Sequence, residues 1–443
     1  MASVMLLNML CVSALPAAAI LAPDATYAAA ASTAVTPNTI NPSVTAPQLK
    51  LNSAILIEPT TGQVLLSLNP DEPLPPASMT KMMTEYIVAD QIKQGKHKWS
   101  DVVTVGENAA QSIGSRIFLA KGDQHTIEQL YIAMAVGSAN DATVALAEYI
   151  SGSEENFVKL MNETAKKMGM KNTVFINSTG LDRADMPAKY RPDTDKETLM
   201  TARDASILAT RIIQDHPDFN KYTTIQNYKF RDRDASPIVN WNWMLEANKN
   251  VTNFKQFAYE GLDGLKTGHT SNAGNCFTGT AVRNGVRLIS VVFGADTEAH
   301  RFTETKKVLD YGFNNFEVKQ VVAPKTTVKG TETVNVTKGK ESSVPVVTDK
   351  AVSFIVPKGA KDPKLTTKTN ITPAESLVAP LKSGTKVGTV TYTYQLDAKA
   401  QPQTQTVNLI TSEEVEKAGW FRQLFRAIGE FFGDLFDSIK NLF

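Results

Sequence analysis

The sequence predicts an α+β fold over residues 50–317, followed by a small all-β domain (318–411) and an amphipathic C-terminal helix (412–443). Strand patterns stand at both ends of the first segment and helical patterns fill its middle, so distant strands must complete one sheet. Short Val- and Thr-rich stretches separated by turn residues follow. The end of the chain carries an apolar stripe at steps of three and four residues.

The predicted strands of the first domain are two hairpins and a short single strand. Residues 53–70 place two apolar runs around a Pro-Thr-Thr-Gly turn. Residues 264–270 form a short stretch bounded by glycine. In the second hairpin, over 276–296, Asn284-Gly285 is the two-residue turn, which is a strong local signal.

Helices are predicted between and after these strands. Gly169 suits a helix C-cap, and Pro217 stops the helix that precedes it. The expected helical segments are 79–92, 126–137, 141–152, 153–169, 202–217 and 301–316.

Charge and composition exclude two classes of function. The 443 residues carry a net charge of +1, which gives no overall signal for nucleic acid. No two of the five histidines stand at metal-ligand spacing, so we expect neither a bound metal nor a cofactor.

The first 30 residues predict a secretory signal peptide. An apolar run over 4–21 is followed by the small residues of "TYAAAAS". A membrane-spanning anchor is the alternative, since the run is nearly long enough, but Pro16 and the small residues favour cleavage. Cleavage would leave Cys276 as a lone cysteine. Residues 31–49 are rich in Ala, Thr and Pro, and we expect a disordered spacer there.

Three short motifs stand in matching structural contexts. They are Ser78-Met79-Thr80-Lys81 at a helix start, Ser138-Ala139-Asn140 between two helices, and Lys266-Thr267-Gly268 on a strand. Each is common by chance, and a single helical lysine usually faces water. Lys81 follows Ser78 by one helical turn, so its amine can reach the hydroxyl. A neutral Lys81 could activate Ser78, and burial or a second cation such as Lys266 would make it neutral.

The chain resembles the low-molecular-mass penicillin-binding proteins that are D-alanyl-D-alanine carboxypeptidases. The three motifs, with S-D-N as the middle member, occur in class A β-lactamases and penicillin-binding proteins. The resemblance implies a β-lactamase/DD-peptidase-like domain, with an antiparallel sheet, helices on both sides and a helical subdomain. It also implies removal of the terminal D-alanine from peptidoglycan stem pentapeptides, and acylation by β-lactam antibiotics. The similar segments are "PASMTKMMT", "GSANDATVALAE", "NSTGL", "TARD", "NWNWML" and "GLDGLKTGHT".

The resemblance also implies a role for each residue of the first two motifs. Ser78 would be the nucleophile and Lys81 its base. Ser138 would bridge Lys81 and Lys266 in a proton relay to the leaving amine. Asn140 would hold an amide of the substrate.

The third motif and its neighbours would bind the substrate. Lys266 and Thr267 would hold the terminal carboxylate, and Gly268 would let the substrate backbone lie close to the strand. The backbone N–H groups of Ser78 and His269 would form the oxyanion hole. Arg301 would be a second carboxylate contact, although it can equally be a surface arginine.

Three other functions remain open from sequence. A class A-like β-lactamase would carry S-D-N and a deacylating glutamate, whereas this chain has Ser-Ala-Asn and lacks a convincing E-x-x-[LN] loop after Ser138. A DD-endopeptidase would share all three motifs. A non-catalytic penicillin sensor or wall-binding scaffold would have no need of Lys81.

The C-terminal stretch predicts a helix that lies in a membrane surface. The face opposite the apolar stripe is too charged to span a bilayer. Docking of the helix on the β domain is the alternative. We therefore expect an exported protein, peripheral on the outer face of the bacterial cytoplasmic membrane. The stripe consists of Phe421, Leu424, Phe425, Ile428, Phe431, Phe432, Leu435, Phe436, Ile439, Leu442 and Phe443.

Overall fold

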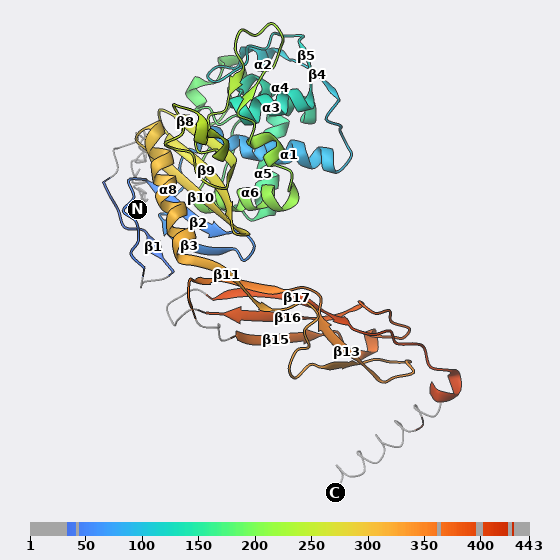
Figure 1. The fold of residues 1–443 in the computed structure, drawn as a ribbon. Helices are drawn as coiled ribbons and strands as arrows, with labels where there is room; N and C mark the ends of the chain where they lie inside the picture. Colours follow the sequence, from blue (N-terminus) through green and yellow to red (C-terminus); the bar gives the residue numbers. More distant parts are fainter. Residues whose placement is uncertain (1–32, 41–43, 361–364, 396–401, 424–427, 429–443) are drawn as a thin grey trace, which may run out of the picture.

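The computed structural model describes residues 33–40, 44–360, 365–395, 402–423 and 428. A mixed α/β body is followed by an elongated all-β domain, and strand β11 (Phe316–Val322) leads from one to the other (Figure 1). The predicted α+β class, with helices on both sides of an antiparallel sheet, is confirmed.

The central sheet has six strands in the order β1-β3-β2-β10-β9-β8. The N-terminal hairpin joins the C-terminal one through antiparallel pairing of β2 with β10, in which Ile55 faces Val291. Distant segments therefore complete one sheet, as predicted. Its strands are β1 (Asn38–Thr39), β2 (Ser53–Glu58), β3 (Gln63–Leu68), β8 (Leu262–Thr270), β9 (Gly274–Arg283) and β10 (Val286–Ala295).

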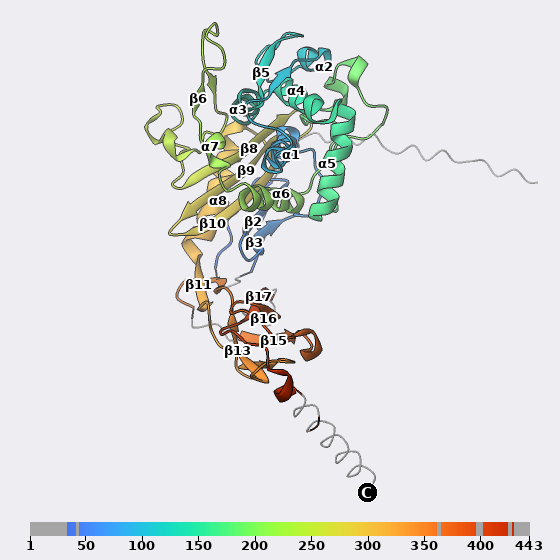
Figure 2. The same ribbon diagram turned by 90° about the vertical axis from the view of Figure 1, so that its right-hand side faces the viewer.

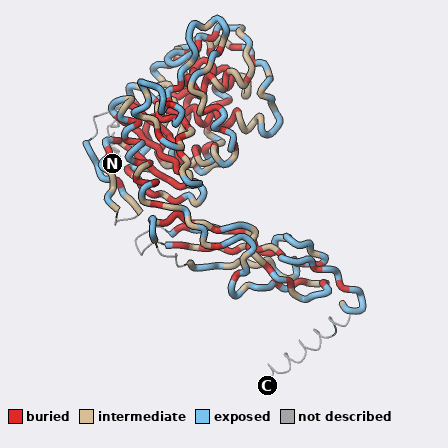
Figure 3. Tube along the Cα trace, in the orientation of Figure 1, coloured by how far each residue is buried: buried red, intermediate tan, exposed pale blue. Residues whose placement is uncertain are grey.

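Helices cover both faces of this sheet because its strands alternate two apolar faces. Ile55 and Ile57 belong to the core shared with α1 and α6, whereas Ala54 and Leu56 belong to the core under α8. Helix α8 lies along one face in Figure 1, and Figure 2 shows α1, α5 and α6 on the other side. Buried residues concentrate in this body (Figure 3). The helices are α1 (Lys81–Lys93), α5 (Glu154–Met168), α6 (Ala202–Asp215) and α8 (Glu298–Asn315).

A helical subdomain with its own apolar core stands beside the sheet. Helix α3 begins at a capping box made by Thr126 and Gln129. Ser138 is its C-cap, and α4 starts at Asn140, so the Ser-Ala-Asn motif is the turn between them. The elements are α2 (Glu107–Gln111), α3 (Ile127–Gly137), α4 (Asn140–Ser151), α7 (Asn220–Thr223), β4 (Val102–Thr104), β5 (Gln124–Thr126), β6 (Asn227–Tyr228) and β7 (Ile238–Val239).

Two local predictions differ from the structure. A short 3-10 helix, η1 (Ala77–Thr80), precedes α1, where one helix from residue 79 was expected. Helix α8 starts at Glu298, before the expected residue 301, because the Thr297 side chain caps it. The remaining 3-10 helices are η2 (Arg183–Asp185), η3 (Ala188–Tyr190), η4 (Glu246–Asn250) and η5 (Ala374–Ser376).

Part of the expected disordered spacer is ordered. Strand β1 pairs with β3, and Val35 bridges to Leu49. Leu49 is fully buried in the core beneath α8. The spacer prediction is therefore wrong for these residues, because a few apolar side chains attach an otherwise polar segment to the sheet.

The all-β domain consists of two small antiparallel sheets around a valine-rich core. One pairs β11 with β14, and the other has the order β12-β13-β17-β16-β15. Val346, Val356 and Val390 are fully buried between them. The strands are β12 (Thr333–Asn335), β13 (Ser343–Thr348), β14 (Val352–Pro357), β15 (Leu365–Ile371), β16 (Lys386–Tyr394) and β17 (Gln403–Thr411).

Both predicted terminal segments lie largely outside the described residues. The signal peptide (1–30) falls there entirely, and the C-terminal helix (412–443) is described only over 412–423 and at 428. Among the described helices, none is long and apolar enough to cross a membrane.

Candidate active site

A cavity of about 290 Å³ opens where η1, strand β8 and the turn between α3 and α4 meet. The three sequence motifs come from these three elements, although 188 residues separate Ser78 from Lys266. Its lining residues are Ser78, Gly114, Ser115, Ser138, Trp241, Thr267, Gly268, His269, Glu298 and Arg301.

Ser78 and Lys81 are joined at the start of α1. The Lys81 Nζ lies 2.9 Å from the Ser78 Oγ and donates to the Thr179 carbonyl at 2.8 Å. Lys81 is fully buried. Burial first, and then the charge of Lys266, hold the pKa of Lys81 well below its usual range. The shift favours the neutral form of the amine, which is the form that can accept a proton from the serine.

The Asn-Ser-Thr-Gly loop (177–180) holds the Lys81 amine in place. The Asn177 Oδ1 accepts the N–H groups of Thr179 at 3.1 Å and Gly180 at 2.6 Å. Gly180 has a φ of +82°, and a Cβ there would lie 1.8 Å from the Ala77 carbonyl oxygen. Only glycine lets this loop pack directly against η1.

The Ser-Ala-Asn turn presents two polar side chains in different ways. Ser138 ends α3 with a φ of 56°, and its Oγ accepts from the Lys266 Nζ at 2.9 Å. The Asn140 Nδ2 donates to the Ile113 carbonyl at 2.6 Å. The Asn140 Oδ1 is buried and has no hydrogen-bond partner among the described residues.

The loop that forms one wall of the cavity is anchored to the same turn. The Asp141 carboxylate accepts the N–H groups of Ile117 at 3.1 Å and Leu119 at 3.0 Å. The Asn140 N–H donates to the Ser115 carbonyl at 2.7 Å. The turn thereby positions both the Ser138 hydroxyl and this wall.

Strand β8 forms the opposite wall. Lys266 is buried, and burial lowers its pKa to about 8, so it remains largely protonated at neutral pH. A Cβ on Gly268 would lie 2.5 Å from the Pro76 carbonyl oxygen. The glycine therefore brings β8 against η1, a structural reason that the sequence reading did not anticipate.

Arg301 closes the cavity from helix α8. Its side chain is only 2% exposed, so the alternative of a surface arginine is wrong. The Arg301 Nη1 donates to the Gly268 carbonyl at 3.3 Å. Burial lowers the pKa of Arg301 to about 10, which leaves the guanidinium charged at neutral pH.

The structure gathers all nine sequence-predicted residues into one region, in two layers. Lys81, Asn140 and Lys266 are buried behind the cavity wall. The six that line the cavity are Ser78, Ser138, Thr267, Gly268, His269 and Arg301.

Trp241 lines the cavity mouth and was not singled out from sequence. It is 43% exposed and lies between the buried residues Asn240 and Asn242. The Asn240 Nδ2 donates to the carbonyls of Thr223 and Ile225, which fixes the segment. The Asn-Trp-Asn pattern was the sequence signal that could have identified Trp241, since a small amide side chain precedes and follows one large aromatic side chain.

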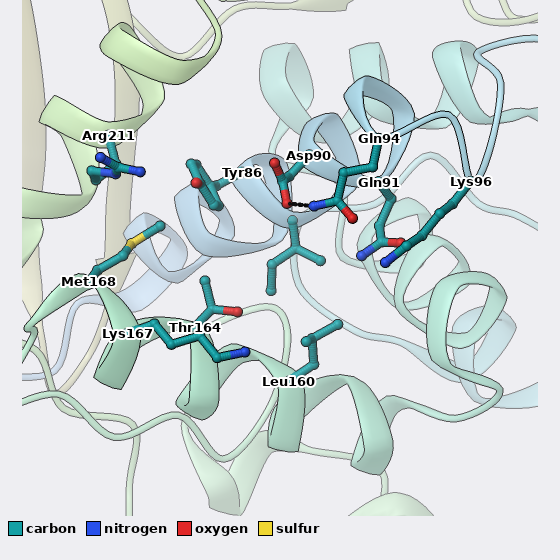
Figure 4. Close-up of a pocket in the computed structure, with 11 residues that line it drawn as sticks. Tyr86, Asp90, Gln91, Gln94, Lys96, Leu160, Thr164, Lys167, Met168 and Arg211 are labelled. Atoms are coloured by element: carbon teal, nitrogen blue, oxygen red, sulfur yellow. Dashed lines mark hydrogen bonds between the residues drawn. The ribbon is translucent and has the colours of Figure 1, made fainter. Parts of the chain in front are cut away.

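A larger hollow lies elsewhere and holds none of these residues. It measures about 540 Å³ and is formed by α1 and α5, with Arg211 of α6 and Lys96 at its edges (Figure 4). Size alone therefore does not identify the active site of this molecule.

Two family models and several known proteins match this chain. A model described as D-alanyl-D-alanine carboxypeptidase matches residues 40–297, and one described as penicillin-binding protein 5, C-terminal domain, matches 316–417. D-alanyl-D-alanine carboxypeptidase DacF of Bacillus subtilis is 35% identical, covering 85% of this chain and 89% of the relative. DacC of Escherichia coli is 36% identical, covering 86% and 88%. Penicillin-binding protein 5 from Haemophilus influenzae matches with a TM-score of 0.66 at 33% identity, covering 84% and 100%.

Proposed function

This chain belongs to the D-alanyl-D-alanine carboxypeptidase family, and from that premise we propose that Ser78 is its catalytic nucleophile. The chain is a serine-type carboxypeptidase and a penicillin-binding protein. The observation that carries the proposal is the fully buried Lys81 amine at 2.9 Å from the Ser78 Oγ. The substrate is the stem pentapeptide of peptidoglycan, which ends in D-alanyl-D-alanine.

Acylation begins when the Ser78 Oγ bonds to the carbonyl carbon of the penultimate D-alanine. The serine proton passes to the Lys81 Nζ, which the low pKa leaves free to receive it. The N–H groups of Ser78 and His269 stabilise the oxyanion. The bond to the terminal nitrogen then breaks, and the proton reaches the leaving amine through the Ser138 Oγ.

Substrate orientation depends on the positive charges at the cavity wall formed by strand β8 and helix α8. Lys266 and Arg301 are the buried cations beside the cavity, and with the Thr267 hydroxyl they bind the terminal carboxylate. The unpartnered Asn140 Oδ1 accepts an N–H of the peptide backbone.

Deacylation completes the cycle. Lys81 takes a proton from the water that attacks the ester carbonyl, the bond to the Ser78 Oγ breaks, and Lys81 returns that proton to the serine oxygen. A β-lactam presents a strained amide and a carboxylate in a similar arrangement, so it acylates the same serine.

Release of D-alanine from a diacyl-D-alanyl-D-alanine peptide tests this function. We expect one free D-alanine per peptide cleaved, and slow release of bound penicillin. Rapid penicillin turnover without D-alanine release would instead indicate a β-lactamase. Cleavage confined to cross-linked muropeptides would indicate an endopeptidase.

The protein is proposed to be exported and held at the outer face of the cytoplasmic membrane by its C-terminal stretch. The support is the sequence pattern of apolar residues from Phe421 to Phe443. From Trp420 onward three basic and three acidic residues cancel, so attachment depends on buried apolar area. Burying one Leu or Phe contributes roughly 1.5–3 kcal/mol.

Truncation after Glu413 is expected to give a soluble enzyme that retains its carboxypeptidase activity. Membrane sedimentation of the full-length and truncated proteins measures this. High salt should leave the full-length protein on membranes, because screening does not weaken apolar burial, whereas detergent should release it. Asp437→Asn, on the polar face, is the matched control. Release by salt alone, or sedimentation of the truncated form, would contradict the proposal.

A further inference from the structure

Glu85 is a buried carboxyl group that the mechanism above does not use. It follows Lys81 by four residues, so the two side chains lie on the same face of α1. The Glu85 side chain is 3% exposed, and its Oε1 has no hydrogen-bond partner among the described residues. A buried carboxylate without such partners is costly unless a nearby charge compensates it.

The compensating charges are the two active-site lysines. Burial raises the pKa of Glu85 to about 7 even though the charges of Lys266 and then Lys81 oppose this rise. Conversely, among the charged groups Glu85 has the largest effect on the pKa of Lys266. It raises this pKa and so opposes the effect of burial. On Lys81 the repulsion from Lys266 exceeds the attraction of Glu85.

The other ionisable groups around this cluster are engaged elsewhere. Asp141 of α4 also acts on Lys81, but its carboxylate accepts three backbone N–H groups. Tyr131 of α3 feels Glu85, and burial first raises the pKa of Tyr131 well above its usual range, which keeps it neutral. Arg301 of α8 acts on Lys266 as a second cation and lies 3.9 Å from Glu298.

The net charge of Glu85, Lys81 and Lys266 indicates the role of this carboxylate. With Glu85 ionised, its cluster with Lys81 and Lys266 is neutral only when a single lysine carries a proton. The proposed reaction needs that proton on Lys266, which binds a carboxylate, and a neutral Lys81. The two lysines compete, and Glu85 favours Lys266.

We propose that Glu85 is a positioning residue for a proton: its carboxylate is the counter-charge that keeps Lys266 protonated while Lys81 stays neutral. This inference rests on the proposed function of the two lysines. It implies that the substrate carboxylate is bound by a cation that would otherwise lose its proton near neutral pH.

Glu85→Gln tests the inference, because it keeps the shape of the side chain and removes its charge. Activity of the wild-type enzyme should fall at alkaline pH as Lys266, with a pKa of about 8, loses its proton. Loss of a nearby opposite charge lowers a lysine pKa by about 1–3 units. The alkaline limb of kcat/KM should therefore move to lower pH by at least roughly one unit, mainly through KM. Glu85→Asp, which keeps the charge, should restore most of the wild-type profile.

A merely structural role predicts a different result. Glu85→Gln would then lower the melting temperature and leave both limbs of the pH profile where they are in the wild type. Coincident profiles would overturn the inference. If Glu85→Gln does not fold, Glu85→Ala gives the same comparison. The rate of acylation by a fluorescent penicillin, measured against pH, supplies the profiles even for an enzyme that releases no D-alanine. Failure of the proposed function is thus distinguishable from failure of this inference.

Discussion

Lys81→Ala is expected to reduce acylation by about 10²–10⁴-fold, the usual effect of removing a general base. The Ser78 hydroxyl would keep its place in η1 but lose the amine 2.9 Å away. Lys266 is not placed to substitute, because its Nζ is directed to the Ser138 Oγ at 2.9 Å. The second-order rate of labelling by a fluorescent penicillin measures the loss.

The control for this substitution is Lys96→Ala, which removes an exposed lysine just beyond the same helix. It should leave the labelling rate unchanged. Lys266→Ala should differ from both, weakening recognition of carboxylate-bearing substrates through KM more than it slows acylation. A Lys81→Ala enzyme that folds and is labelled at the wild-type rate would remove Lys81 from the role of base.

Gly180→Ala is expected to damage both stability and catalysis. The new Cβ would stand 1.8 Å from the Ala77 carbonyl oxygen, so backbone must move on one side or the other. Strain of this kind costs about 1–3 kcal/mol. The loop also supplies the Thr179 carbonyl that holds Lys81, and a displacement near 1 Å can cost about 10²-fold in rate.

Gly169→Ala separates the clash from the cost of the backbone conformation. Gly169 has a φ of +84°, close to that of Gly180, but a Cβ there would meet nothing within 4 Å. Thermal unfolding should show a modest loss of stability in Gly169→Ala and a larger one in Gly180→Ala, and penicillin labelling should slow only in Gly180→Ala. Equal labelling rates in the two variants would mean that the loop does not position the active-site residues.

The sequence was most informative where local patterns determine structure. The Asn284-Gly285 turn and the alternating apolar residues around it were enough to locate the β9–β10 hairpin. The three motifs located the elements that meet at the candidate active site for a similar reason, since each combines a polar side chain with a helix start, a turn or a strand. Leu49 shows the opposite case, in which one apolar residue in an Ala-, Thr- and Pro-rich segment is buried by a distant helix.

Contacts between distant segments could not be predicted in this way. Nothing in the spacing of Gly180 and Gly268 indicates that both approach η1, because each close contact joins segments about 100 or more residues apart. Glu85 is similar, since its position after Lys81 suggests only a shared helix face. Its importance depends on burial and on Lys266, which comes from strand β8.

The most direct test of Ser78 as the nucleophile is to locate the bond that penicillin forms with the protein. After brief exposure, digestion and mass spectrometry should place one penicilloyl adduct on Ser78. Ser78→Ala should carry no adduct and release no D-alanine. An adduct on Ser138, the other serine hydroxyl bonded to an active-site lysine, would contradict the assignment of the nucleophile, as would labelling that persists in Ser78→Ala.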